Sequence, residues 1–122
     1  IIEEPGAVYI NDTRRTVVRE YDLRTGRQVR AINIRKMSFI NTLVFRSVLR
    51  ALKEKGIAFF GRQRKATARP LYLRGLAINE GSIFAGFSPA TIVRIDKVSG
   101  QLVDYYIHST DMRDCIHGLC CE

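Results

Sequence analysis

Apolar residues recur along most of the chain in short runs separated by the turn-forming residues Gly, Pro, Asn, Asp and Ser. This pattern predicts β-strands joined by tight turns. The clearest series predicts strands near 71–78, 83–87, 91–96 and 101–107. In the first part of the chain we expect matching strands over 7–10, 16–21 and 27–32, preceded by a short strand at Ile1 and Ile2.

One segment departs from the strand pattern and has the spacing of a helix. Its apolar residues recur three and four positions apart, which places them on one helix face. They are Phe39, Ile40, Leu43, Val44, Val48, Leu49 and Leu52. Gly56 is suited to end the helix. We therefore predict a helix over about 37–56 that lies outside the sheets and covers a sheet edge or face with Phe39, Leu43, Leu49 and Leu52.

The sequence also contains an internal repeat. Leu73–Ile78 recurs in modified form as Ile116–Cys121, 43 residues further on, and the turn that runs from Asp22 to Gly26 recurs from Asp96 to Gly100, 74 residues further on. Repeats of this length indicate a repeated structural unit. We predict a unit of about 43 residues present twice, with the helix and its neighbours inserted after the first copy.

Four short antiparallel strands repeated about every 40 to 50 residues are typical of a β-propeller blade. The runs Arg74-Gly75-Leu76-Ala77 and Phe84-Ala85-Gly86-Phe87-Ser88, followed by Ile95-Asp96 and Gly100, resemble blades of the TolB-like and quinoprotein-like propellers. They are most similar to the uncharacterised bacterial members of these families. The resemblance covers residues 1–34 and 71–122.

This resemblance implies an all-β fold of two four-stranded antiparallel propeller blades with one helical insertion. The expected divisions are a first blade over 1–34, an insertion over 35–70, a second blade over 71–108, and the inner strand of a third blade over 115–121. A propeller ring takes about four to eight blades. We therefore expect a part of a larger propeller, whose remaining blades are the partners; the alternative is a ring closed by several copies of the chain.

The charge of the chain is unevenly distributed. The net charge is +8, but residues 13–74 hold seventeen basic and three acidic residues, and the rest of the chain is net acidic. Such asymmetry favours an acidic partner, although a solvated basic face is an alternative. The densest cluster contains Arg62, Arg64, Lys65 and Arg69, which could contact phosphates. No aromatic residue inside it could stack on bases, so nucleic-acid binding is the less favoured hypothesis.

The resemblance implies a ligand site at the mouth of the central propeller channel. The candidates are Arg74 and His117 at one repeat position in neighbouring units, Asp111, Arg113 and Asp114 in the preceding loop, and Ser88 between the second and third strands. An arginine beside a histidine would suit an anionic small molecule or a carboxylate on a protein. Alternatively, Arg74 pairs with a local carboxylate and His117 bonds a backbone carbonyl.

The chain offers little sign of catalysis. It has no nucleophile elbow and no phosphate-binding glycine motif. In an extended strand, Cys120 would oppose Cys115, His117 and Cys121, so the four cannot converge on a metal ion. We therefore expect no cofactor and no metal, and a non-catalytic binding or scaffold module. The alternatives are a lactonase- or hydrolase-like propeller enzyme with its catalytic residues in other blades, and a basic nucleic-acid-binding module.

Two further expectations concern the compartment. The three cysteines lie within the last eight residues and form no disulfide framework, which indicates a reduced, cytoplasmic chain. No apolar run approaches the roughly 18 residues that a membrane span requires.

Overall fold

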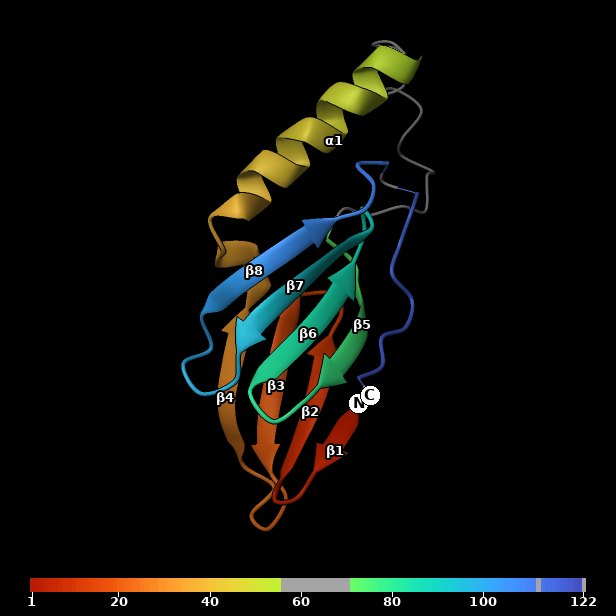
Figure 1. Cartoon of the computed structure of the whole chain (residues 1–122). Helices are drawn as coiled ribbons and strands as arrows, with labels where there is room; N and C mark the ends of the chain where they lie inside the picture. Colours follow the sequence, from red (N-terminus) through yellow and green to blue (C-terminus); the bar gives the residue numbers. More distant parts are fainter. Residues whose placement is uncertain (56–70, 112, 122) are drawn as a thin grey trace.

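The computed structural model describes residues 1–55, 71–111 and 113–121. Within them, the strands form two four-stranded antiparallel sheets, and each sheet pairs its strands in chain order (Figure 1). The first sheet contains β1 (Ile2–Glu4), β2 (Ala7–Asp12), β3 (Val17–Asp22) and β4 (Gln28–Asn33); the second contains β5 (Leu73–Ile78), β6 (Ser82–Phe87), β7 (Thr91–Asp96) and β8 (Leu102–Ile107). The mostly β fold, the strand positions and the antiparallel pairing predicted from the sequence are confirmed.

The two sheets share one register. Equivalent cross-strand triplets are Tyr9–Glu20–Arg30 in the first sheet and Phe84–Arg94–Asp104 in the second. Each sheet also has a bulge at the same place in its fourth strand, at Val29 and at Val103. Residues 74 or 75 positions apart therefore occupy equivalent places, as the sequence repeat predicts.

The turn between the third and fourth strands is also built twice. Asp22 and Asp96 open the two turns, and the Oδ1 atom of each accepts the backbone N–H of the third residue after it, at 2.8 and 2.6 Å. Gly26 and Gly100 close them with φ of 65° and 71°, a conformation that glycine adopts without strain. Hydrogen bonds from the residue three positions on lower the pKa of both aspartates.

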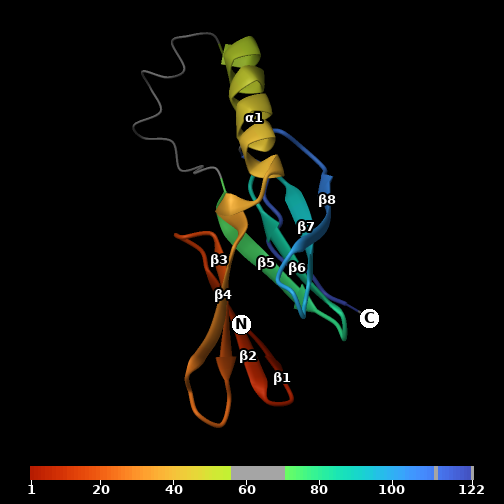
Figure 2. The same cartoon turned by 90° about the vertical axis from the view of Figure 1, so that its left-hand side faces the viewer.

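The main hydrophobic core lies between the sheets, because the second sheet lies across one face of the first (Figures 1 and 2). Tyr9, Val18 and Ile32 of the first sheet and Ile83 and Val93 of the second are all buried in it. Neither sheet could bury this face alone, so each depends on the other for its stability.

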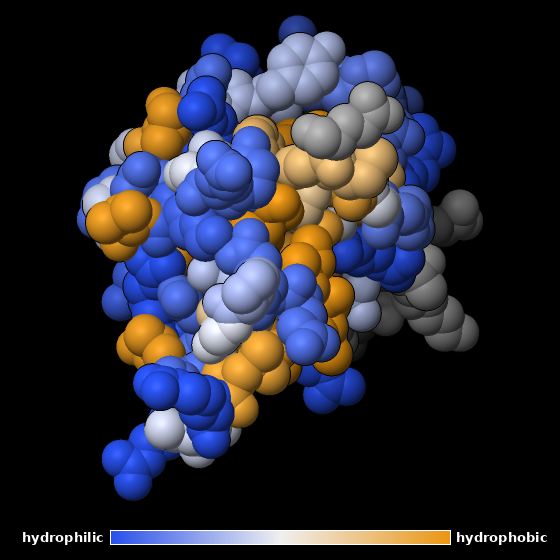
Figure 3. Space-filling model, turned by 60° about the horizontal axis from the view of Figure 1, so that its bottom comes forward, coloured by the Kyte–Doolittle hydropathy of each residue, from blue (hydrophilic) through white to orange (hydrophobic). Residues whose placement is uncertain are grey.

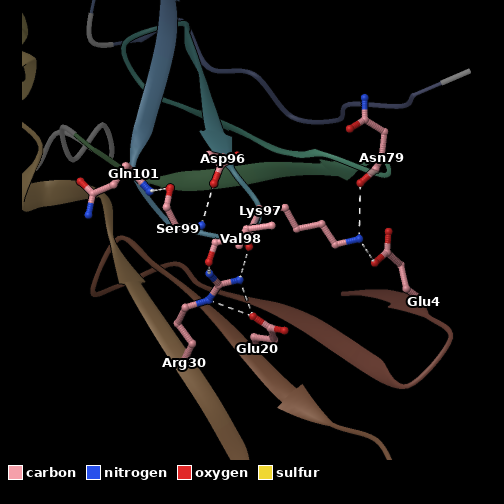
Figure 4. A network of polar contacts seen from close by, with 9 residues as sticks. All are labelled: Glu4, Glu20, Arg30, Asn79, Asp96, Lys97, Val98, Ser99 and Gln101. Carbon is pink, nitrogen blue, oxygen red and sulfur yellow. Dashed lines mark hydrogen bonds and ion pairs between the residues drawn. The ribbon is translucent and has the colours of Figure 1, made fainter.

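Polar contacts at the rim of the core hold the β7–β8 turn against the first sheet (Figure 4). The Arg30 guanidinium donates to the backbone carbonyl oxygens of Lys97 and Val98, at 2.6 and 2.9 Å, and to Glu20 Oε2, at 2.6 Å. Lys97 in turn forms an ion pair with Glu4. Hydrogen bonds to charged groups contribute about 1.5–3 kcal/mol each, so Arg30 is a principal link between the sheets.

The helix α1 (Phe39–Lys55) follows a short 3₁₀ segment, η1 (Ile34–Lys36), and confirms the helix predicted over about 37–56. Its first turns pack against the sheets, with Leu43 fully buried. The Phe39 ring stacks on Tyr105 of β8, with ring centres 4.4 Å apart.

The rest of the helix extends away from the sheets (Figures 1 and 2). Leu49 is 41% exposed and Leu52 is half-buried, so the prediction that Leu49 belongs to the covered face is wrong. The apolar stripe is present, but the direction of the helix carries its second half past the end of the sheets.

Residues 115–121 contain no strand, so the inner strand predicted there is wrong. Ile116 and Leu119 instead pack over Gly75 and Gly86, which face each other in β5 and β6. This contact is made by side chains on the face of the sheet. A strand needs a backbone partner, and none is paired with this segment among the described residues.

The glycine pair predicts a steric effect. A Cβ added to Gly86 would lie 2.5 Å from Ile116 Cγ2, whereas a Cβ added to Gly81 meets nothing within 4 Å. We expect Gly86→Ala to lower the free energy of unfolding by about 1–3 kcal/mol in urea denaturation, because the side chains above it must move. Gly81→Ala is the control and should be near neutral; equal effects would contradict the packing described.

The helix predicts a difference between two leucines. Leu43→Asp places a charge in the core and should cost several kcal/mol, on the order of 3 or more. Leu49→Asp changes an exposed residue of the same helix and should shift the melting temperature little. Comparable losses in thermal unfolding would show that the Leu49 face is buried.

The core predicts a dependence of stability on alkaline pH. Tyr9 is 1% exposed, and burial together with the negative charge of Glu20 raises its pKa to about 12. The unfolded chain ionises at the lower pKa of 10.0, so this contribution is complete below pH 10 and is lost as the pH rises toward 12. From pH 9 to pH 12, the wild type should lose about 2 kcal/mol more unfolding free energy than Tyr9→Phe. Parallel curves for the two proteins would contradict this assignment.

Candidate anion-binding site

Arg74 lies at a β-bulge in β5. The pairing of β5 with β6 skips this residue between Leu73 and Gly75, and a bulge of this kind re-aims the side chain. Asn11 of the first sheet contacts the bulge through Nδ2, which donates to the carbonyl oxygens of Arg74 and Gly75, both at 3.3 Å. Contacts from both sheets therefore hold the backbone that carries the exposed Arg74 side chain.

The Arg74 guanidinium contacts two neighbouring side chains. Its Nη1 atom lies 3.0 Å from Nδ1 of His117, and its Cζ atom lies 4.9 Å from the centre of the Tyr72 ring, a cation–π distance. Arginine can only donate, so Nδ1 of His117 accepts and Nε2 carries the proton. The prediction that Arg74 and His117 lie near each other is confirmed.

The charge of Arg74 is not neutralised by an ion pair within the described part of the chain. The alternative in which a local carboxylate pairs with Arg74 is therefore not found among these residues. Among the described residues, three nitrogen atoms are left to donate to a ligand: Nε and Nη2 of Arg74 and Nε2 of His117. Both side chains are exposed.

The predicted loop residues pair with one another. Asp111 and Arg113 form an ion pair, and the guanidinium lowers the pKa of the Asp111 carboxyl well below its usual range. Asp114 is exposed, and its backbone N–H donates to the Asp111 carbonyl at 3.0 Å. The same loop contacts α1, where Arg50 Nη1 lies 3.4 Å from Thr110 Oγ1. The charges of Asp111 and Arg113 are thus already paired with each other.

Ser88 lies beside the start of β5 and is buried. Its backbone N–H donates to the carbonyl of Tyr72 at 3.3 Å, and the Cys115 thiol lies 4.0 Å from the same carbonyl oxygen. Burial raises the pKa of the Cys115 thiol, while the positive charge of Arg74 opposes the shift. Ser88 therefore supports the backbone next to the exposed pair and does not form part of its surface.

The predicted basic patch of Arg62, Arg64, Lys65 and Arg69 lies outside the described residues. Within the ranges that are described, no three or more His, Cys, Asp and Glu side chains are placed to hold a metal ion. No helix in those ranges is long and apolar enough to cross a membrane.

A hollow of about 580 Å³ lies between β4 and the β7–β8 turn, away from Arg74. Its lining includes Arg30, whose guanidinium is already bonded to Glu20 and to two backbone carbonyls. The charge of Arg30 in this hollow is therefore compensated, in contrast to that of Arg74.

Two contacts of the site were not predicted from the sequence. Tyr72 precedes Arg74 by two residues, a spacing that places both on one face of a strand, and this signal could have identified it. Asn11 is 63 residues from Arg74, and no local pattern indicates that its amide supports the bulge.

The described chain is a repeat of two antiparallel sheets that carries an exposed Arg–His pair at the first strand of the second sheet. No protein-family model and no curated protein matches it. The functional argument is therefore made from the fold and from this pair.

Proposed function

We propose that this chain is a non-catalytic binding module whose two sheets are neighbouring blades of a β-propeller. In this arrangement Arg74 and His117 bind a carboxylate or a similar anion at the mouth of the central channel. The observation that carries the proposal is the contact between Arg74 and His117, with no carboxylate of the described chain paired to Arg74.

The course of the C-terminal segment supports the propeller arrangement. Two contacts join it to the first strand of the second sheet: His117 to Arg74, and Cys115 to Tyr72. Both link residues 43 positions apart, so the segment runs alongside β5 in the same direction (Figure 1). The innermost strands of neighbouring propeller blades run side by side in one direction around the channel, and β1 also contacts β5.

The chemistry of the pair supports an anionic ligand. The planar fork of arginine can donate two parallel hydrogen bonds to a carboxylate, and the Nε2–H group of His117 supplies a third donor beside it. The Tyr72 ring under the guanidinium restricts its orientation. The described residues offer no comparable support for the alternative enzyme or nucleic-acid-binding functions.

The proposal predicts a ligand effect that depends on Arg74. Citrate and succinate, titrated at constant ionic strength, should raise the melting temperature of the wild-type chain, because a ligand that binds the folded state stabilises it. Arg74→Ala should abolish this rise while the melting temperature of the free protein changes little, and Arg74→Lys should retain only part of it.

The matched control is Arg46→Ala, which removes an exposed arginine of α1 and should leave the ligand effect intact. An unchanged citrate response in Arg74→Ala would exclude this residue from the site. A response lost equally in Arg46→Ala would indicate unspecific attraction to the basic surface.

A further inference from the structure

The two faces of the second sheet are unequally covered. One face packs on the first sheet. On the far face, Ile116 and Leu119 cover the glycines of β5 and β6. Tyr106 of β8 remains 63% exposed, and Arg94 and Asp104 beside it are exposed as well. The half of the far face formed by β7 and β8 is therefore open.

In the first sheet, the equivalent positions are buried. The shared register places Ile92 and Tyr106 of the second sheet where the first sheet has Val18 and Ile32. Val18 is 0% and Ile32 is 6% exposed, because the second sheet covers them. The open face of the second sheet thus has the same register and the same kind of apolar centre as the face of the first sheet that binds the second.

The charges beside this apolar centre are inverted between the sheets. In the first sheet they are Glu20 and Arg30, and Arg30 donates to backbone carbonyls of the next sheet's turn. In the second sheet, Arg94 and Asp104 occupy these two places. The β7–β8 turn meets the guanidinium of Arg30 on the first sheet. A turn that docks in the same way on the second sheet meets the carboxylate of Asp104, so it must supply hydrogen-bond donors or positive charge.

The β3–β4 turn of the first sheet supplies that charge. It has the same Asp-to-Gly architecture as the β7–β8 turn, but it carries Arg24 where the second turn has Val98. Arg24 is exposed, and Arg27 follows it. The β3–β4 turn of one molecule therefore carries positive charge that can be attracted to the Asp104 carboxylate of another.

The free face of the first sheet also carries apolar side chains. Val8, Ile10 and Tyr21 are half-buried and occupy the positions that Ile83, Ala85 and Ile95 have in the second sheet. From below, the molecule shows hydrophobic side chains exposed among hydrophilic ones (Figure 3). The first sheet can thus present an apolar surface together with its basic turn.

We infer that the open half of the far face of the second sheet, formed by β7 and β8, binds the first sheet of a second copy of this chain, with Arg24 of one copy attracted to Asp104 of the other. This inference rests on the proposed arrangement of the sheets as blades. The two surfaces are different, so copies associate head to tail and build a closed ring or an open string of molecules.

Sedimentation of the full chain, from micromolar to hundreds of micromolar concentration, tests the inference. We expect association that grows with concentration, and a loss of at least about tenfold in affinity for Tyr106→Asp, which buries a charge in the contact. Phe45→Asp is the control: it makes the same kind of change at an exposed aromatic residue of α1 and should leave association unchanged.

Charge reversal identifies the surfaces involved. Asp104→Arg and Arg24→Glu should each weaken association by about tenfold, because like charges then face each other. Both substitutions in one chain should restore it. An equimolar mixture of the two single variants should restore it too, because every contact can then form between opposite charges.

A chain that stays monomeric at all concentrations overturns the inference. Association that is indifferent to Tyr106→Asp, or that is not restored by the paired charge reversals, overturns it as well and points to another surface or another occupant. The citrate response of Arg74 is measured separately. A monomer that still binds citrate through Arg74 would refute the association and leave the proposed function standing.

Discussion

The contact between Arg30 and the β7–β8 turn fixes how the two sheets lie on each other. Hydrophobic burial drives the sheets together but has no direction, whereas the two hydrogen bonds that the Arg30 guanidinium donates to the turn carbonyls have a defined geometry. Glu20, in the same sheet as Arg30, holds the guanidinium in place. The position of the second sheet in turn places β5 beside β2, where Asn11 reaches the bulge at Arg74. The location of the candidate site thus depends on a contact made by β4, an edge strand of the first sheet.

The two sheets share one backbone arrangement, but equivalent positions carry side chains of different chemistry. Asn11 and Gly86 occupy equivalent positions in the second strand of each sheet, and both contact the strand or segment that follows their own sheet. Asn11 does so by hydrogen bonds from an amide, and Gly86 by the absence of a side chain. These two equivalent positions therefore make equivalent contacts by different physical means.

Much of the fold follows from local patterns in the sequence. Turn residues and apolar runs determine the strands. The recurrence of Leu73–Ile78 as Ile116–Cys121, 43 residues further on, is the pattern from which the proximity of Arg74 and His117 could be predicted. The exposure of Leu49 could not be predicted, because an apolar stripe identifies a helix face but does not say which other element covers it. The prediction of a strand over 115–121 was wrong because extended residues form a strand only when another backbone pairs with them. The pairing of Asp111 with Arg113 depends on a loop conformation that residue spacing does not determine.

The two facing glycines of β5 and β6 also select the alignment of the C-terminal segment. They leave a slot bare of side chains, in which Ile116 lies nearest Gly86 and Leu119 lies nearest Gly75. A slip by one residue would put the imidazole of His117 or the thiol of Cys115 into that slot and leave the isoleucine outside. The hydrocarbon fit therefore favours one alignment over its neighbours, and that alignment is the one in which the imidazole meets the guanidinium of Arg74. The position of His117 beside Arg74, and with it the specificity of the site for a polar ligand, would then depend on how the neighbouring Ile116 packs over the two glycines.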